Sequence, residues 1–237
     1  MNIRIQSVMI ASLIGVSINS ALACGRPNFA NDVTLPLQRK EVFIRENFVK
    51  MPGSSNRCIF SAVWVSERIE LGGNIKVYVA TYIQDENKKI SDMTIDTAAE
   101  MIWFAPETHV DKAIFNINNS VAAFGIRTAS IFLGGTFGED KEQFDLILDD
   151  GKGKLRSVLS AIASSSYQRD CGRNNCDADD VRNVPVLIIN ENKTYNFSDI
   201  VVKHYELRSQ PTQRHKDRRK LLKSETYKWN GEKYVSQ

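Results

Sequence analysis

The residues with the greatest potential for chemistry stand close together between Cys171 and Asp180. Cys171 and Cys176 are followed directly by three carboxylates, those of Asp177, Asp179 and Asp180. Thiolates and carboxylates at such spacing could bind a metal, act in redox chemistry or form a disulfide-closed turn with an acidic rim. The spacing and the compartment of the protein decide among these three uses.

The spacing argues against a metal or redox centre in this stretch. Asn175, Asp177 and Asp179 stand at every second position, like the oxygen ligands of a calcium loop. However, Asp180 stands where an EF-hand loop needs glycine, and Val186 stands where it needs glutamate. Zinc would need further soft ligands, and a redox pair would follow the C-x-x-C pattern. We therefore expect no metal site and no cofactor.

The first 23 residues have the pattern of a secretory signal peptide. Arg4 is the one charged residue, an apolar run follows from 8 to 18, and the stretch ends in Ala21-Leu22-Ala23. A basic start, a short apolar middle and an A-x-A end are typical of such signals, and the run is too short to span a membrane. We expect a mature protein of residues 24–237 in the periplasm or outside the cell.

The cysteine count favours disulfides over a lipid anchor. A cysteine directly after the cut, Cys24, is typical of bacterial lipoproteins, but Ala21 stands where those signals usually have leucine. Lipidation would leave three cysteines, whereas ordinary cleavage leaves four that can pair in an oxidising compartment. Of the three possible pairings we favour Cys24–Cys58 and Cys171–Cys176. A lipid anchor at Cys24 is the alternative.

Size and composition fit one globular domain. The mature chain of 237 − 23 = 214 residues has ample length for a hydrophobic core, and we allow for a subdivision near 136–143. A basic run at 214–223 is the main local charge excess. Such a run could bind an anionic partner, but a solvated surface is the more common use. Export and the lack of interleaved aromatic residues argue against nucleic acid.

Strand patterns dominate the chain. In 75–83 the β-branched residues alternate with a more mixed set, as in a half-buried antiparallel strand. Strands are also expected at 58–71, 184–190 and 200–207, and Asn230-Gly231 predicts a closing hairpin. We therefore predict an α+β fold that is β-rich, with a mainly antiparallel sheet and two or so short helices.

Two segments carry helix patterns. Thr97 and Glu100 have the spacing of a capping box, which predicts a short helix that ends before Pro106. In the second segment, apolar residues at 155, 158, 159 and 162 have the i, i+3, i+4, i+7 spacing of a helix face. Residues 24–40 look irregular.

Catalytic motifs are missing from the sequence. There is no G-x-S-x-G elbow, no H-E-x-x-H pair and no phosphate-binding loop. His204, Asp199 and Asp145 would be the candidates for a dispersed hydrolase site. We assign no catalytic residue and leave enzymatic activity open.

The C-terminal third resembles a group of small exported bacterial proteins of unassigned function. The resemblance covers about residues 171–235 and rests on CGRNNC, then PVLIIN, then YNFSDIVV, then ETYKWNGEKYV. These motifs imply a strand-rich fold and an exported location, and they transfer no functional residue.

Together these patterns favour a non-catalytic protein-binding module of the cell envelope. The most specific version of this hypothesis is an inhibitor or an immunity protein against an exported toxin, with Asp177, Asp179 and Asp180 in contact with the partner. An envelope hydrolase with a dispersed site and a structural surface protein are the alternatives.

Overall fold

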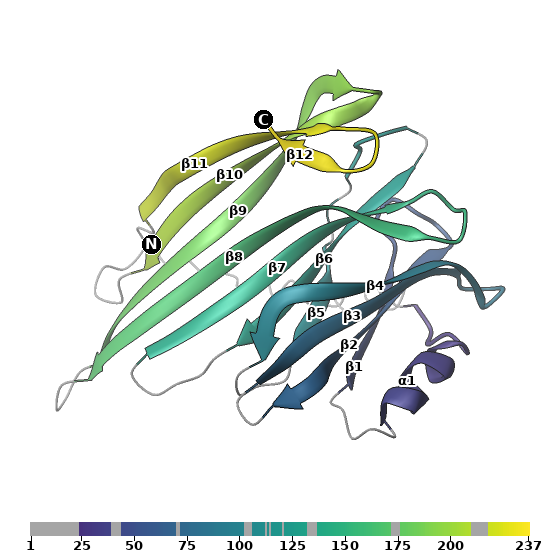
Figure 1. The fold of residues 1–237 in the computed structure, drawn as a ribbon, viewed down its shortest axis with the longest axis horizontal. Helices are drawn as coiled ribbons and strands as arrows, with labels where there is room; N and C mark the ends of the chain where they lie inside the picture. Colours follow the sequence, from purple (N-terminus) through teal and green to yellow (C-terminus); the bar gives the residue numbers. More distant parts are fainter. Residues whose placement is uncertain are drawn as a thin grey trace, which may run out of the picture.

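The computed structural model describes residues 24–38, 44–69, 72–101, 106–111, 113, 115–119, 121–131, 137–171, 176–209 and 218–237. Its strands form two antiparallel sheets (Figure 1). The first sheet has the order β1-β2-β3-β4, with β1 Ile44–Lys50, β2 Arg57–Ile69, β3 Gly72–Ile83 and β4 Lys88–Met101. Each strand pairs with the strand next to it in the sequence, so this sheet is a meander.

The second sheet has eight strands in the order β12-β11-β10-β9-β8-β7-β6-β5, again a meander. Its strands are β5 Glu107–Val110, β6 Ala122–Ile131, β7 Phe137–Asp149, β8 Leu155–Cys171, β9 Cys176–Thr194, β10 Phe197–Ser209, β11 Arg218–Trp229 and β12 Tyr234–Ser236. The predicted closing hairpin is confirmed as β11 and β12, whose partners include Trp229 and Tyr234.

The β-rich, antiparallel part of the fold prediction is confirmed, whereas the α+β class is matched only loosely. The described residues contain one helix, α1 (Ala30–Gln38), where the sequence looked irregular. Residues 97–101 belong to β4 instead of the predicted helix, and Glu100 is the register partner of Asn74 in β3. The Thr97 hydroxyl donates to the carbonyl of Ile75 across the sheet, so cross-strand pairing replaces the expected cap.

The second predicted helix, at 155–163, is part of β8, and a β-bulge explains its misleading pattern. Leu146 of β7 is the partner of Leu159, but the next residue, Ile147, is the partner of Ser157. Val158 is therefore an extra residue, and it reaches the same core as Leu159. The bulge brings Val158 and Leu159 to the same core, whereas Leu155 packs between the two sheets and Ile162 is 51% exposed, so the four residues of the predicted helix face do not share one face.

Three hydrophobic clusters hold the layers together. One lies between the two sheets and joins residues such as Val63 and Val77 of the first sheet to Phe124 and Ile147 of the second. Another lies beneath α1 on the outer face of the first sheet, around Phe60. The third joins the other face of β6–β8 to β9, β10 and the closing hairpin; it includes Phe144, Leu146, Leu187, Val202 and Trp229.

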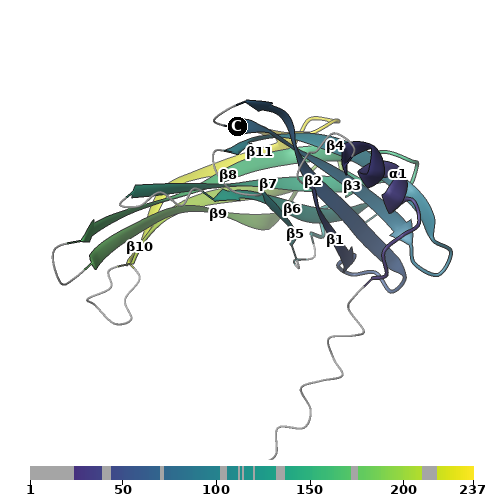
Figure 2. The ribbon, with the colours of Figure 1, turned by 90° about the horizontal axis from the view of Figure 1, so that it is seen from below.

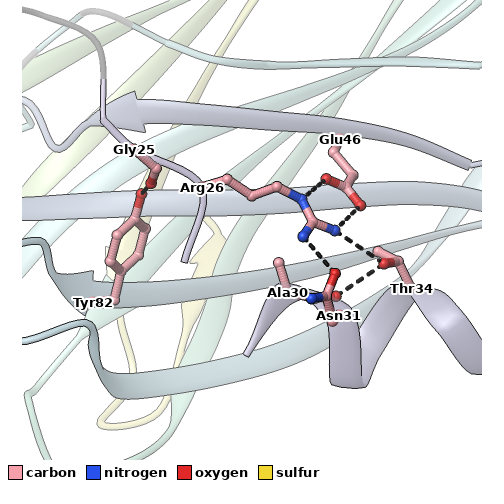
Figure 3. Close-up of polar contacts among 7 residues, drawn as sticks. All are labelled: Gly25, Arg26, Ala30, Asn31, Thr34, Glu46 and Tyr82. Carbon is pink, nitrogen blue, oxygen red and sulfur yellow. Dashed lines mark hydrogen bonds and ion pairs between the residues drawn. The ribbon is translucent and has the colours of Figure 1, made fainter. Parts of the chain in front are cut away.

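The segment 24–29, which precedes α1 and which we call the N-terminal strap, fixes α1 to the first sheet. The Arg26 guanidinium donates to both carboxylate oxygens of Glu46, at 2.7 and 2.9 Å, and also to the Asn31 side chain (Figure 3). Hydrogen bonding to Arg26 lowers the pKa of Glu46. The Tyr82 hydroxyl donates to the carbonyl of Gly25. Figure 2 shows α1 on the outside of the first sheet, at the end of the molecule away from β9 and β10.

The segment near 136–143, where a subdivision was allowed for, falls at the beginning of β7 (Phe137–Asp149). The single mature domain stays a prediction. Among the described residues, α1 is much shorter than a membrane-crossing helix would be.

Candidate functional site

The cysteine-rich stretch that dominates the sequence forms the tip of a hairpin. Cys171 ends β8, Cys176 begins β9, and the two are register partners. Residues 172–175 and the side chains of both cysteines lie outside the described parts, so the Cys171–Cys176 disulfide stays a prediction.

The three carboxylates that follow belong to a strand and not to a loop. Asp177, Asp179 and Asp180 lie in β9, where their backbones pair with Asp170, Gln168 and Tyr167 of β8. The side chains of the three lie outside the described parts of the chain, so their contact with a partner stays a prediction.

The other predicted disulfide, Cys24–Cys58, is confirmed, with a Cα–Cα distance of 6.1 Å. Both cysteines are buried. The Sγ atom of Cys24 is bonded to Cys58 and therefore cannot carry the thioether of a lipid anchor. The predicted signal peptide, 1–23, lies outside the described residues.

The three candidates for a dispersed hydrolase site lie far apart. Asp145 is on β7, three strands from β10, which carries Asp199 and His204. Along the sheet, three strand spacings amount to about 14 Å, and five residues along β10 separate Asp199 from His204 by roughly 16 Å. The fold therefore does not bring the three side chains into one site.

Each of the three side chains has a local partner instead. Asp145 is buried and accepts hydrogen bonds from Gln143 and Ser157, and burial raises its pKa. Asp199 accepts from Thr194, and His204 Nε2 lies 3.3 Å from a carboxylate oxygen of Glu225. Within the described ranges, no group of three or more His, Cys, Asp or Glu side chains is arranged to hold a metal.

The register of β9, β10 and β11 defines a different candidate, which sequence reasoning missed. Four rows of side chains cross these strands on the face opposite the third hydrophobic cluster, and we call them the outer face. From the hairpin tip inward, the rows are Arg182–Leu207–Arg219, Val184–Tyr205–Leu221, Val186–Lys203–Ser224 and Ile188–Val201–Thr226.

The outer face is apolar but uncovered. Seven of its twelve residues are apolar, and none of the twelve is buried; Leu221 is 50% exposed and Ile188 is 40% exposed. By contrast, the neighbouring residues Leu187, Ile189 and Val202 on the opposite face belong to the third hydrophobic cluster. No outer-face residue belongs to any hydrophobic cluster of the described chain. A contiguous exposed apolar face of this kind marks an interaction site more often than a simple surface.

The charge of the outer face has one sign. Its charged residues are Arg182, Lys203 and Arg219, and these four described rows contain no acidic residue. The Arg219 guanidinium lies 3.6 Å from the centre of the Tyr205 ring, a cation–π contact that holds both side chains along the sheet surface. The basic charge therefore sits among the apolar side chains and faces solvent.

The opposite face of the same strands has mixed charge. There His204 and Lys223 both lie beside Glu225, and Arg208 pairs with Glu206. Because these charges are mutually compensated, this side offers an acidic partner much less than the outer face does.

One sequence signal could have indicated the outer face. The strands 184–190 and 200–207 carry apolar residues on both sides, a pattern that usually means burial on both faces. The structure covers one side only. The basic run at 214–223 enters β11, so its residues from 219 onward become the exposed side chains of a strand.

Comparison with known proteins adds no relative: no family model, curated protein or solved structure matches the chain significantly. The candidate site therefore rests on its own geometry.

Proposed function

We propose that this chain is a non-catalytic protein-binding module of an oxidising, exported compartment, and that the outer face of β9–β11 is its binding surface. The observation that carries the proposal is the four-row face, apolar and purely basic, that lies outside every hydrophobic cluster of the described chain. An acidic, partly apolar protein surface is its natural complement, because such a partner would cover the aliphatic side chains and place carboxylates beside Lys203 and Arg219.

The compartment is supported by the Cys24–Cys58 disulfide, since such bonds persist mainly in oxidising surroundings. It is further supported by the signal-peptide pattern of the first 23 residues. The proposal keeps the protein-binding role expected from the sequence, and an inhibitor or immunity protein is one form of it. The proposal adds the outer face as a second binding surface, besides the acidic residues at 177–180.

A protein partner is favoured over a membrane surface by the shape of the face. Val184, Val186 and Val201 are short β-branched side chains on a pleated surface, partly covered by their neighbours. Leu221 and Ile188 project further, but the twelve outer-face residues include no Trp and no Phe, which are typical of membrane-interfacial surfaces.

Lysine footprinting tests the proposal. The protein is acetylated in its native cell envelope, after extraction in mild detergent, and after purification, and Lys203 is compared with Lys152 in an exposed turn. We expect Lys203 to be protected in the envelope and in detergent and to react freely in the purified protein, with Lys152 reactive throughout. Equal reactivity of Lys203 in all three states would refute the proposal, and protection lost in detergent would indicate lipid instead.

A further inference from the structure

The strand β11, at one border of the outer face, has a free edge. On one side β11 pairs with β10 from Arg218 to Tyr227. On the other side β12 pairs only with Tyr227, Lys228 and Trp229. The backbone N–H of Gln237 then donates to the carbonyl of Thr226, and no described residue continues the ladder beyond that point. The edge from 218 to 225 is therefore unpaired within the described chain.

The side chains along this edge are exposed and combine two features. Arg219 and Lys220 are basic, Lys223 lies 2.9 Å from the carboxylate of Glu225 on the same edge, and Leu221 and Leu222 are 50% and 46% exposed. Basic residues and a bulge usually protect an edge strand from pairing with a second copy of itself, because like charges would meet. Here the register of β11 shifts at Leu222, so both devices are present. The same charges attract a strand of opposite sign.

We propose that the partner binds by strand addition: an extended acidic segment pairs with the free edge of β11 and continues the ladder where β12 leaves it. This inference rests on the proposed function and names the binding mode. Carboxylates of the added strand would lie opposite Arg219 and Lys220, and its apolar side chains would cover Leu221 and Leu222. A second copy of this chain is disfavoured because two basic edges would meet.

The outer face alone is smaller than a stable protein interface, so its partner needs an additional source of binding energy. A stable protein interface uses about 20–30 residues from each partner, and the outer face has twelve. Main-chain hydrogen bonds along an added strand would supply affinity that the side chains of the face cannot supply alone. The face and the edge share Arg219 and Leu221, so one partner can cover both.

The direction of the backbone groups shows which position to change. Successive residues of a strand point their N–H and C=O groups to opposite sides. The Thr226 carbonyl points outward to Gln237, so the N–H of Ser224 also points to the free edge, whereas Lys223, the partner of His204, points to β10. Proline is tolerated on an edge strand where the N–H faces solvent. Ser224→Pro therefore removes one outward donor and keeps every charge.

The experiment compares Ser224→Pro with Ser224→Ala, which keeps the N–H, after thermal unfolding confirms that both fold. The probe is a synthetic peptide with glutamates opposite Arg219 and Lys220 and valines opposite Leu221 and Leu222. A matched peptide carries lysines in place of the glutamates. We expect the acidic peptide to slow exchange of the outward amide hydrogens of Leu221 and Ser224 in the native protein. We expect Ser224→Pro to weaken binding by at least 10-fold and Ser224→Ala by less than 2-fold.

Equal binding of the two peptides, or equal binding to both variants, would overturn strand addition. If Lys203 is nevertheless protected in the native envelope, the outer face still binds a protein and only the binding mode is wrong. If Lys203 is unprotected there, the proposed function itself fails, whatever the peptide does. If the native protein and Ser224→Pro both bind vesicles of anionic phospholipid more tightly than they bind the acidic peptide, the surface is assigned to a membrane instead.

Discussion

Asp149 is a buried side chain that ties the two sheets together through polar contacts. Its fully buried carboxylate, at the end of β7, accepts hydrogen bonds from Thr81 of β3 and Ser91 of β4, at 2.8 and 2.9 Å. Arg57 of β2 lies 3.2 Å away, and the N–H of Gly151 closes the turn that follows. Both carboxylate oxygens of Asp149 thus have partners within the protein, which is a structural role.

Removing this carboxylate should be costly. Asp149→Ala leaves the hydroxyls of Thr81 and Ser91 and the guanidinium of Arg57 without their shared acceptor, so we expect a loss of about 3 kcal/mol in the free energy of unfolding. Urea unfolding measures it. The exposed neighbour provides the control, because Asp150→Ala should change stability by less than about 0.5 kcal/mol. Similar values for both variants would contradict the structural role of Asp149.

Asp145 should give stability a distinct pH dependence. Burial raises its pKa in the folded protein above the unfolded value, so the folded state favours the protonated form. The associated stability is present at pH below about 4 and is lost as the pH rises through the raised pKa. Asp145→Asn does not titrate. The stability of the native protein relative to this variant should therefore fall as the pH rises above about 4; a relative stability that rises with pH would contradict the effect of burial on this carboxylate.

At the scale of the element, the N-terminal strap should be a separable source of stability. The Cys24–Cys58 bond closes a loop with a sequence separation of 34, for which the chain-entropy relation gives about 3–4 kcal/mol. The double variant Cys24→Ser, Cys58→Ser should lose about that much. Hydrogen exchange should increase first in α1 (Ala30–Gln38), while β7 exchanges as before. Unchanged exchange in α1 would show that Arg26 and Tyr82 hold the strap without the disulfide.

The elements also show what the sequence can predict. Alternating strands such as 75–83 and the Asn230-Gly231 hairpin were predictable, because a period of two and a turn residue act locally. The predicted helices were wrong at 97–101 and at 155–163, because a cross-strand bond replaced the cap at Thr97 and a bulge at Val158 brought two adjacent apolar residues to one face of a strand; 102–105 lie outside the described residues. The helix α1 was missed because its stability comes from packing on Phe60 and from the strap rather than from its own residues.

At the scale of the whole molecule, the candidate site depends on long-range register. The Cys24–Cys58 pair could be proposed from parity and proximity in the sequence. The outer face could not, because its rows combine residues from β9, β10 and β11 that lie up to 38 positions apart, as Val201 and Thr226 join Ile188 (226 − 188 = 38). Nor does an apolar residue in the sequence indicate which face of its strand the fold leaves uncovered.

The central claim, that a protein covers the outer face, is tested most directly by site-specific photo-crosslinking in the native cell envelope. A photoreactive phenylalanine analogue replaces Leu221 on the outer face and, as the matched control, Lys152 in the exposed turn after β7. We predict a discrete protein adduct from position 221, lost when Arg182, Lys203 and Arg219 are all changed to Ser, and no such adduct from position 152. Absence of a protein adduct at 221, or the same adducts at both positions, would contradict the account.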